Sequence, residues 1–129
     1  MTTQNNIRLL ITGGAGFIGS NLVEHFLNDD RVALVRVLDD LSNGYYENIQ
    51  EFEGHPKFEF IKGDICDYDT CLTACEGIHK ISHQAALGSV PRSIENPMLT
   101  NKVNVGGTVN VLHAAKEQGV ERVILAFSS

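Results

Sequence analysis

The stretch that decides the fold of this chain is Ile7-Arg8-Leu9-Leu10-Ile11-Thr12-Gly13-Gly14-Ala15-Gly16-Phe17-Ile18-Gly19. Its β-prone start stops at a glycine turn, which predicts a buried strand over 7–11. From residue 16, apolar residues recur at helical spacing until Asn28, which predicts a helix directly after the turn. Gly13 permits a tight turn, Gly16 lets the backbone approach a pyrophosphate, and Gly19 lets the helix lie close to the sheet. With the N–H groups of the helix N-terminus, these glycines predict a phosphate-binding turn.

An acidic pair supplies a second, independent signal. The near-continuous apolar run over 32–38 predicts a parallel strand covered on both faces, and it ends at Asp39-Asp40, where Asp39 lies twenty residues after Gly19. A carboxylate in this position binds both hydroxyls of an adenosine ribose, whereas a 2′-phosphate would need Arg or Lys. We therefore expect NAD in preference to NADP. The alternative, turn glycines in a fold that binds nothing, is disfavoured because strand, helix and acid are in register.

The rest of the chain alternates between strand and helix patterns. Strands are predicted over 58–61, 78–83 and 120–127, helices over about 67–76 and 98–118, and residues 41–57 predict a loop with one helical turn. Asp67 is the expected cap of the first of these helices, and glycines at 77 and 119 are the expected stops. This order predicts an α/β fold, a Rossmann-type doubly wound parallel sheet with helices on both faces, truncated after about the fifth strand.

Composition narrows the classes of function. The chain has 129 residues, enough for one domain over 1–129, and it is 43% hydrophobic and 20% charged. Its net charge of −6 argues against nucleic acid, and its short apolar runs argue against a membrane span or a signal peptide. Cys66, Cys71 and Cys75 are an odd number without a Cys-x-x-Cys pair, so we expect buried apolar thiols, no metal site and a cytoplasmic location.

Six motifs together resemble a known family. The spacing Gly-x-x-Gly-x-x-Gly is similar to that of the extended short-chain dehydrogenases, in particular the NAD-dependent sugar-nucleotide epimerases and dehydratases. Five further segments match that family in order: Asp39-Asp40-Leu41-Ser42-Asn43-Gly44, Gly63-Asp64-Ile65, His83-Gln84-Ala85-Ala86, Asn104-Val105-Gly106-Gly107-Thr108 and Phe127-Ser128-Ser129. The chain departs from the family pattern at Asp40, where Asn is common, and at Cys66, where Arg is frequent.

The resemblance implies a set of cofactor contacts along the chain. These contacts would surround the pyrophosphate, the ribose, the adenosine side, the adenine and the nicotinamide half of NAD. The residues implied are Gly13, Gly16, Phe17, Ile18, Gly19, Asp39, Asp40, Ser42, Asn43, Gly44, Asp64, Ile65, Gln84, Ala85, Ala86 and Asn104. The loop 87–93 is most similar to the UDP-N-acetylhexosamine 4-epimerases, in which Gly88 and Ser89 would lie near the sugar. An ordinary loop serine is an equal alternative for Ser89.

The implied reaction is inversion at C4 of a UDP-hexose or UDP-N-acetylhexosamine, by hydride transfer to and from NAD through a 4-keto sugar. That chemistry needs a Tyr-x-x-x-Lys pair. Four residues after the three tyrosines stand Ile49, Gln50 and Leu72, and Ser129 lies only at the edge of the catalytic serine motif. We therefore expect this chain to be inactive alone and to act, within a full-length enzyme, on a UDP-sugar as a homo-oligomer. The alternatives are a stand-alone NAD-binding or regulatory module and a dehydratase or reductase of the same superfamily. For His83, packing is favoured over acid–base work.

Overall fold

The computed structural model describes residues 6–41, 45–84 and 106–125. Within them, five strands form one parallel sheet in the order β3-β2-β1-β4-β5. The strands are β1 (Ile7–Thr12), β2 (Val32–Asp39), β3 (Phe58–Lys62), β4 (Lys80–His83) and β5 (Arg122–Leu125). The helices are α1 (Phe17–Leu27), α2 (Tyr68–Cys75) and α5 (Thr108–Glu117), with two 3-10 turns, η1 (Tyr46–Asn48) and η2 (Gln50–Phe52).

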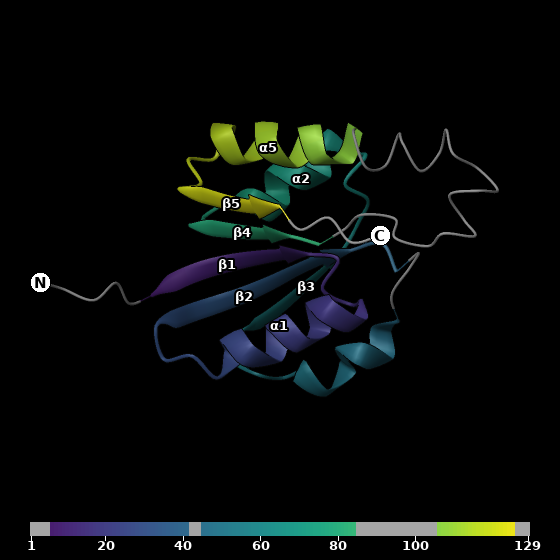
Figure 1. Cartoon of the computed structure of the whole chain (residues 1–129), viewed down its shortest axis with the longest axis vertical. Helices are drawn as coiled ribbons and strands as arrows, with labels where there is room; N and C mark the ends of the chain where they lie inside the picture. Colours follow the sequence, from purple (N-terminus) through teal and green to yellow (C-terminus); the bar gives the residue numbers. More distant parts are fainter. Residues whose placement is uncertain (1–5, 42–44, 85–105, 126–129) are drawn as a thin grey trace, which may run out of the picture.

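Helices cover both faces of the sheet, as the doubly wound prediction requires. In Figure 1, α2 and α5 lie on one side of the sheet, and α1 with the 3-10 turns lies on the other. Successive residues of a strand point to opposite faces. Accordingly, Leu10 of β1 belongs to the core under α2 and α5, while Leu9 and Ile11 belong to the core under α1. The predicted fold class is confirmed.

Several element boundaries differ from the prediction for a reason that lies in the backbone. Ile78 is buried and apolar, but its N–H donates to the carbonyl of Cys75 at 3.1 Å, so it belongs to the turn that ends α2. Val120 likewise donates to Ala115 at 2.9 Å in the turn after α5. Strands β4 and β5 therefore begin later than predicted. Residues 46–52, inside the predicted loop over 41–57, form two 3-10 turns where one helical turn was expected. Residues 98–105 of the predicted helix and 126–127 of the predicted strand lie outside the described residues.

The strand order reverses at one point of the sheet. From β1 the chain runs outward through β2 to β3, and then returns to add β4 and β5 on the other side of β1. The order therefore reverses between β1 and β4. In open α/β sheets, ligands bind outside the carboxyl ends of the strands at such a point.

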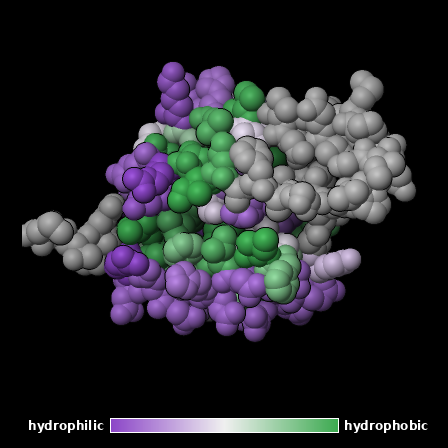
Figure 2. All heavy atoms as spheres, viewed as in Figure 1, coloured by the Kyte–Doolittle hydropathy of each residue, from purple (hydrophilic) through white to green (hydrophobic). Residues whose placement is uncertain are grey.

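The edge strand β5 and the neighbouring part of the sheet expose apolar surface. Ile124 and Leu125 of the edge strand β5 are 56% and 36% exposed. Ile7, Phe26, Ile81 and Ile124 are among the residues that line a groove on the sheet. Figure 2 shows hydrophobic side chains gathered across the middle of this view, between hydrophilic margins. In the described part of the chain, no helix combines the length and the apolar character needed to cross a membrane.

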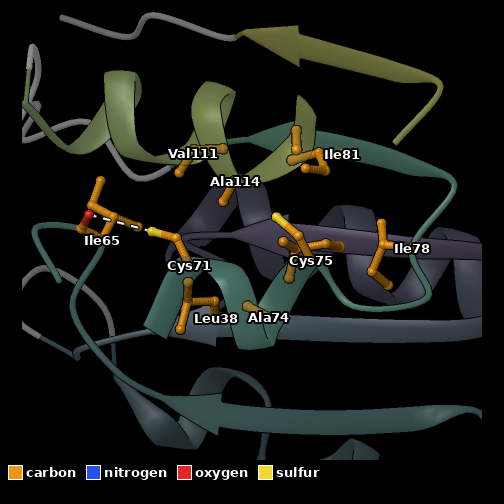
Figure 3. Close-up of a cluster of buried hydrophobic side chains, with 11 residues drawn as sticks. Leu38, Ile65, Cys71, Ala74, Cys75, Ile78, Ile81, Val111 and Ala114 are labelled. Carbon is orange, nitrogen blue, oxygen red and sulfur yellow. Dashed lines mark hydrogen bonds between the residues drawn. The ribbon is translucent and has the colours of Figure 1, made fainter. Parts of the chain in front are cut away.

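Two of the three cysteines belong to the core. Figure 3 shows Cys71 and Cys75 of α2 among the apolar side chains between this helix, α5 and the sheet. Burial raises the pKa of the Cys71 thiol to about 12 and that of Cys75 to about 11, so both stay protonated at neutral pH. Cys66 is only half-buried, and the expectation of three buried thiols is wrong for this residue. Within the described residues, no three potential metal ligands of the His, Cys, Asp and Glu types lie together.

Candidate functional site

The glycine turn joins the end of β1 to the start of α1 in a compact form. Gly13 has a φ of 73°, which glycine adopts without strain, and its N–H donates to the carbonyl of Leu38 at 2.8 Å. Gly16 N–H donates back to the Gly13 carbonyl at 3.1 Å. A Cβ on Gly19 would lie 2.3 Å from the Gly13 carbonyl oxygen. Gly19 therefore lets α1 pack directly on the turn itself, a more specific role than the predicted packing on the sheet.

The N-terminus of α1 is left without a side-chain cap. The cap residue Gly16 offers no side chain, and the first turn of the helix carries no acidic residue. The first N–H groups of a helix have no intrahelical acceptor, and they form the positive end of the helix dipole. Beside them, Phe17 and Ile18 are 80% and 55% exposed despite being large and apolar. This arrangement suits an anionic ligand that also carries apolar surface.

Asp39 ends β2 directly beside this turn. Its Oδ2 accepts the N–H of Ala15 at 2.9 Å, and its Oδ1 accepts the N–H of Leu41 at 2.8 Å. Burial raises the pKa of Asp39, and these two backbone N–H bonds oppose the shift because they favour the charged form. A carboxylate has about four acceptor positions, so each oxygen retains capacity for a further donor such as a ribose hydroxyl.

The structure also reveals contacts around the turn that sequence reasoning missed. The Ala15 carbonyl accepts two bonds, from Tyr45 N–H at 3.2 Å and from Asn48 Nδ2 at 2.7 Å. A Cβ on Gly14, which lies outside the glycine spacing motif, would meet Val37 Cγ1 at 2.6 Å. No sequence signal marks Asn48, and the adjacent glycines at 13 and 14 were the only hint of the close approach at Gly14.

His83 lies in a buried hydrogen-bond network at the switch between β1 and β4. Its Nδ1 bonds to Thr12 Oγ1 at 2.6 Å and its Nε2 bonds to Thr108 Oγ1 at 3.0 Å. Gln84 N–H donates to Thr12 Oγ1 at 3.0 Å, which ties the two strand ends together. Burial lowers the pKa of His83 to about 4, so the ring is neutral at physiological pH. These contacts agree with the packing interpretation of His83.

The loop after β3 adjoins Asp39 on the side away from β1. Gly63 N–H donates to the Asp39 carbonyl at 3.1 Å, which fixes the start of the loop. Asp64 is exposed, and its Oδ1 accepts the N–H of Cys66 at 2.8 Å. Ile65 is buried in the core under α2 and α5. The loop therefore presents the Asp64 carboxylate next to Ile65, which is anchored in the core.

The predicted site residues within the described ranges all lie at or beside the carboxyl ends of β1, β2, β3 and β4. These residues are Gly13, Gly16, Phe17, Ile18, Gly19, Asp39, Asp40, Asp64, Ile65 and Gln84. The other predicted residues lie outside the described ranges: Ser42, Asn43, Gly44, Ala85, Ala86, Gly88, Ser89, Asn104 and Ser129.

A parallel sheet of this order, with a glycine turn entering α1 and an acid ending β2, is a Rossmann-type α/β fold. The family model described as GDP-mannose 4,6 dehydratase matches residues 10–129, and the chain belongs to this family. This confirms the resemblance to the sugar-nucleotide epimerases and dehydratases.

Individual relatives carry out different reactions. A UDP-glucose 4-epimerase from Mycolicibacterium smegmatis is 46% identical over 119 residues, which cover 92% of this chain and 37% of that protein. A 3 beta-hydroxysteroid dehydrogenase/Delta 5-->4-isomerase from Mycobacterium tuberculosis is 40% identical, over 95% of this chain and 32% of that protein. The crystal structure of a dTDP-glucose 4,6-dehydratase from Streptomyces venezuelae with NAD bound matches with a TM-score of 0.85 and 38% identity, over 91% of this chain and 38% of that one. The chain thus spans about a third of the length of these relatives.

Proposed function

We propose that this chain is the NAD-binding part of an enzyme that modifies a nucleotide sugar. The observation that carries the proposal is the bond between Asp39 Oδ2 and Ala15 N–H, 2.9 Å long, because it joins the ribose acid to the phosphate turn. The uncapped start of α1 and the remaining acceptor capacity of Asp39 fit the pyrophosphate and the ribose of one dinucleotide. A relative crystallised with NAD supports the same cofactor.

Each described group at the carboxyl ends of the strands would bind a different part of NAD. The N–H groups of the turn and of α1 would bind the pyrophosphate, while Asp39 accepts two ribose hydroxyls and opposes the 2′-phosphate of NADP. Asp40 would add to this negative field, and the loop at Asp64 and Ile65 would flank the base. The exposed Phe17 side chain would cover the ligand. Bound NAD would supply a hydride acceptor that later returns the hydride.

The reaction we propose for the whole enzyme is inversion at C4 of a UDP-hexose or UDP-N-acetylhexosamine. The epimerase relative at 46% identity supports it, as does the resemblance of the loop 87–93, with Gly88 and Ser89 near the sugar. The 129 residues contain no Tyr-x-x-x-Lys, and Ser129 only borders the catalytic serine motif. These residues alone would therefore bind NAD without turning over the sugar. The resemblance to the family further implies that the whole enzyme would act as a homo-oligomer.

Dehydration of a nucleotide sugar is the second candidate. The matching family model and the dehydratase structure with a TM-score of 0.85 favour it over other reactions of the superfamily. Assay of an enzyme that contains these residues together with a Tyr-x-x-x-Lys segment separates the candidates, since only dehydration releases water from the sugar. A gene that stops after Ser129 would instead favour the stand-alone NAD-binding module.

Calorimetric titration of the chain with NAD and with NADP tests the cofactor proposal. We expect NAD to bind, weakly because the contacts to its nicotinamide half are incomplete, and NADP to bind more weakly still. NADP binding equal to or tighter than NAD binding would contradict the role of Asp39.

A further inference from the structure

The carbonyl oxygen of Ile65 accepts two side-chain hydrogen bonds from different helices. Asn110 Nδ2 of α5 donates to it at 2.9 Å, and Cys71 Sγ of α2 donates at 3.3 Å, the bond drawn as a dashed line in Figure 3. Asn110 is half-buried and lies 45 positions from Ile65 in sequence. The loop after β3 is therefore held by a residue that no local pattern connects with it.

The start of α5 also fits closely against the Ile65 side chain. A Cβ on Gly107 would lie 2.4 Å from Ile65 Cδ1, so a larger residue at this position would force the Ile65 side chain to move. Ile65 itself is 6% exposed. The beginning of α5 thus contacts both the side chain and the carbonyl of Ile65, and together with Cys71 of α2 it holds the loop in its conformation.

The loop in turn sets the position of Asp64. Asp64 is exposed, its Oδ1 is engaged by Cys66 N–H at 2.8 Å, and Asp67 N–H donates to its carbonyl at 3.0 Å. The peptide between Ile65 and Cys66 is anchored inside the protein through the Ile65 carbonyl, and its N–H donates to Asp64 Oδ1. The Asp64 carboxylate is therefore held in a fixed position next to Asp39. A base attached to a ribose at Asp39 would lie against this carboxylate, since Gly63 N–H is bonded to the Asp39 carbonyl at 3.1 Å.

We propose that Asn110 is a positioning residue for base recognition: through Ile65 it holds Asp64 where this carboxylate accepts a hydrogen bond from the amino group of adenine. The inference rests on the proposed function. Hypoxanthine differs from adenine by a carbonyl in place of the amino group, so it would face Asp64 with a second acceptor. The site then discriminates between the two bases only while the loop is held in place.

The test compares the affinities of NAD and of its hypoxanthine analogue in calorimetric titrations of the whole chain. We expect the unmodified chain to prefer NAD. In Asn110→Ala the NAD affinity and the preference for NAD should each fall about two- to tenfold, the range expected for one neutral hydrogen bond. Asn110→Asp, which keeps the size of the side chain but places an acceptor against the Ile65 carbonyl, should reduce the preference at least as much.

A matched control stands at the other end of the same helix. Gln118 Nε2 also donates to a backbone carbonyl across the structure, that of Leu72 at 3.0 Å. Gln118→Ala should therefore change stability to a similar extent while leaving the preference for NAD unchanged. The positioning role is overturned if both Asn110 variants keep the preference of the unmodified chain, or if that chain binds both dinucleotides equally. An unmodified chain that binds neither dinucleotide refutes the proposed function instead.

Discussion

Replacement of Asp39 by alanine tests the link between the glycine turn and the ribose acid. In the free chain the carboxylate accepts the N–H groups of Ala15 and Leu41 at 2.9 and 2.8 Å. Hydrogen bonds to charged groups contribute about 1.5–3 kcal/mol each, and relief of the buried charge offsets part of their loss. We therefore expect Asp39→Ala to lower the free energy of unfolding by about 2–4 kcal/mol.

The same substitution should weaken NAD binding by roughly 1–3 kcal/mol, which is about five- to 150-fold in Kd, because two ribose hydroxyls lose their charged acceptor. NADP should be affected less, so the preference for NAD narrows. Since the hydroxyl bonds favour the charged carboxylate while burial raises its pKa, NAD affinity should also fall as the pH drops toward that raised pKa, and Asp39→Ala should lack this dependence.

Calorimetry with both dinucleotides measures the affinities, and urea unfolding shows how much of each variant is folded. Asp30→Ala removes an exposed carboxylate of the same charge and serves as the control. Asp39→Asn keeps the size of the side chain if the alanine variant is too unstable to titrate. A folded Asp39 variant with unchanged NAD affinity, or an equal loss in Asp30→Ala, would refute the reasoning.

Four further predictions follow from the fold and the site. Because burial lowers the pKa of His83 to about 4 from an ordinary 6.5, the unfolded state takes up the proton first as the pH falls below 6.5. The chain should thus lose about 2 kcal/mol of stability between pH 7 and pH 5 in urea titrations. His83→Gln should abolish this loss and the exposed His113→Gln should keep it, and the opposite pattern would contradict the assignment. Gly14→Ala should destabilise by about 1–3 kcal/mol through its contact with Val37, and much less in a Val37→Ala background, whereas strictly additive losses would argue against that contact. The chain incubated with NAD and UDP-glucose or UDP-N-acetylglucosamine should show no change at C4 by NMR, and epimerisation above a no-protein control would mean that the catalytic assignment is wrong. Sedimentation velocity should detect self-association of the chain through the apolar edge strand β5, and Ile124→Lys should reduce this association. A single monomer species up to about 100 μM would exclude self-association.

The strands and helices that sequence reasoning predicted well are those with a local signal. The apolar run before Gly13 and the helical spacing after Gly16 are each contained within a few residues, and β1 and α1 follow them closely. The acid Asp39 was recognisable because its distance from the turn is fixed by one helix and one strand.

The contacts that hold the site in place were beyond prediction because they join distant segments. Asn48 reaches Ala15 across 33 positions and Asn110 reaches Ile65 across 45, and neither asparagine belongs to a periodic pattern. The second 3-10 turn after β2 was missed for a similar reason. Ile49 and Phe52 are buried in the core under α1, which is a tertiary contact, while the polar residues around them gave no helical pattern in the sequence.

The peptide groups around Ala15 are bonded on both sides, by Asp39 at the N–H and by Tyr45 and Asn48 at the carbonyl. This bonding sets the distance between the phosphate turn and the carboxylate before any ligand arrives. A dinucleotide that binds across both would not have to order this part of the backbone, and ordering of a binding loop is one of the entropic losses that reduce affinity. The carboxyl ends of β1 and β2 are in this sense preorganised, and their rigidity contributes to binding without adding a contact to the ligand.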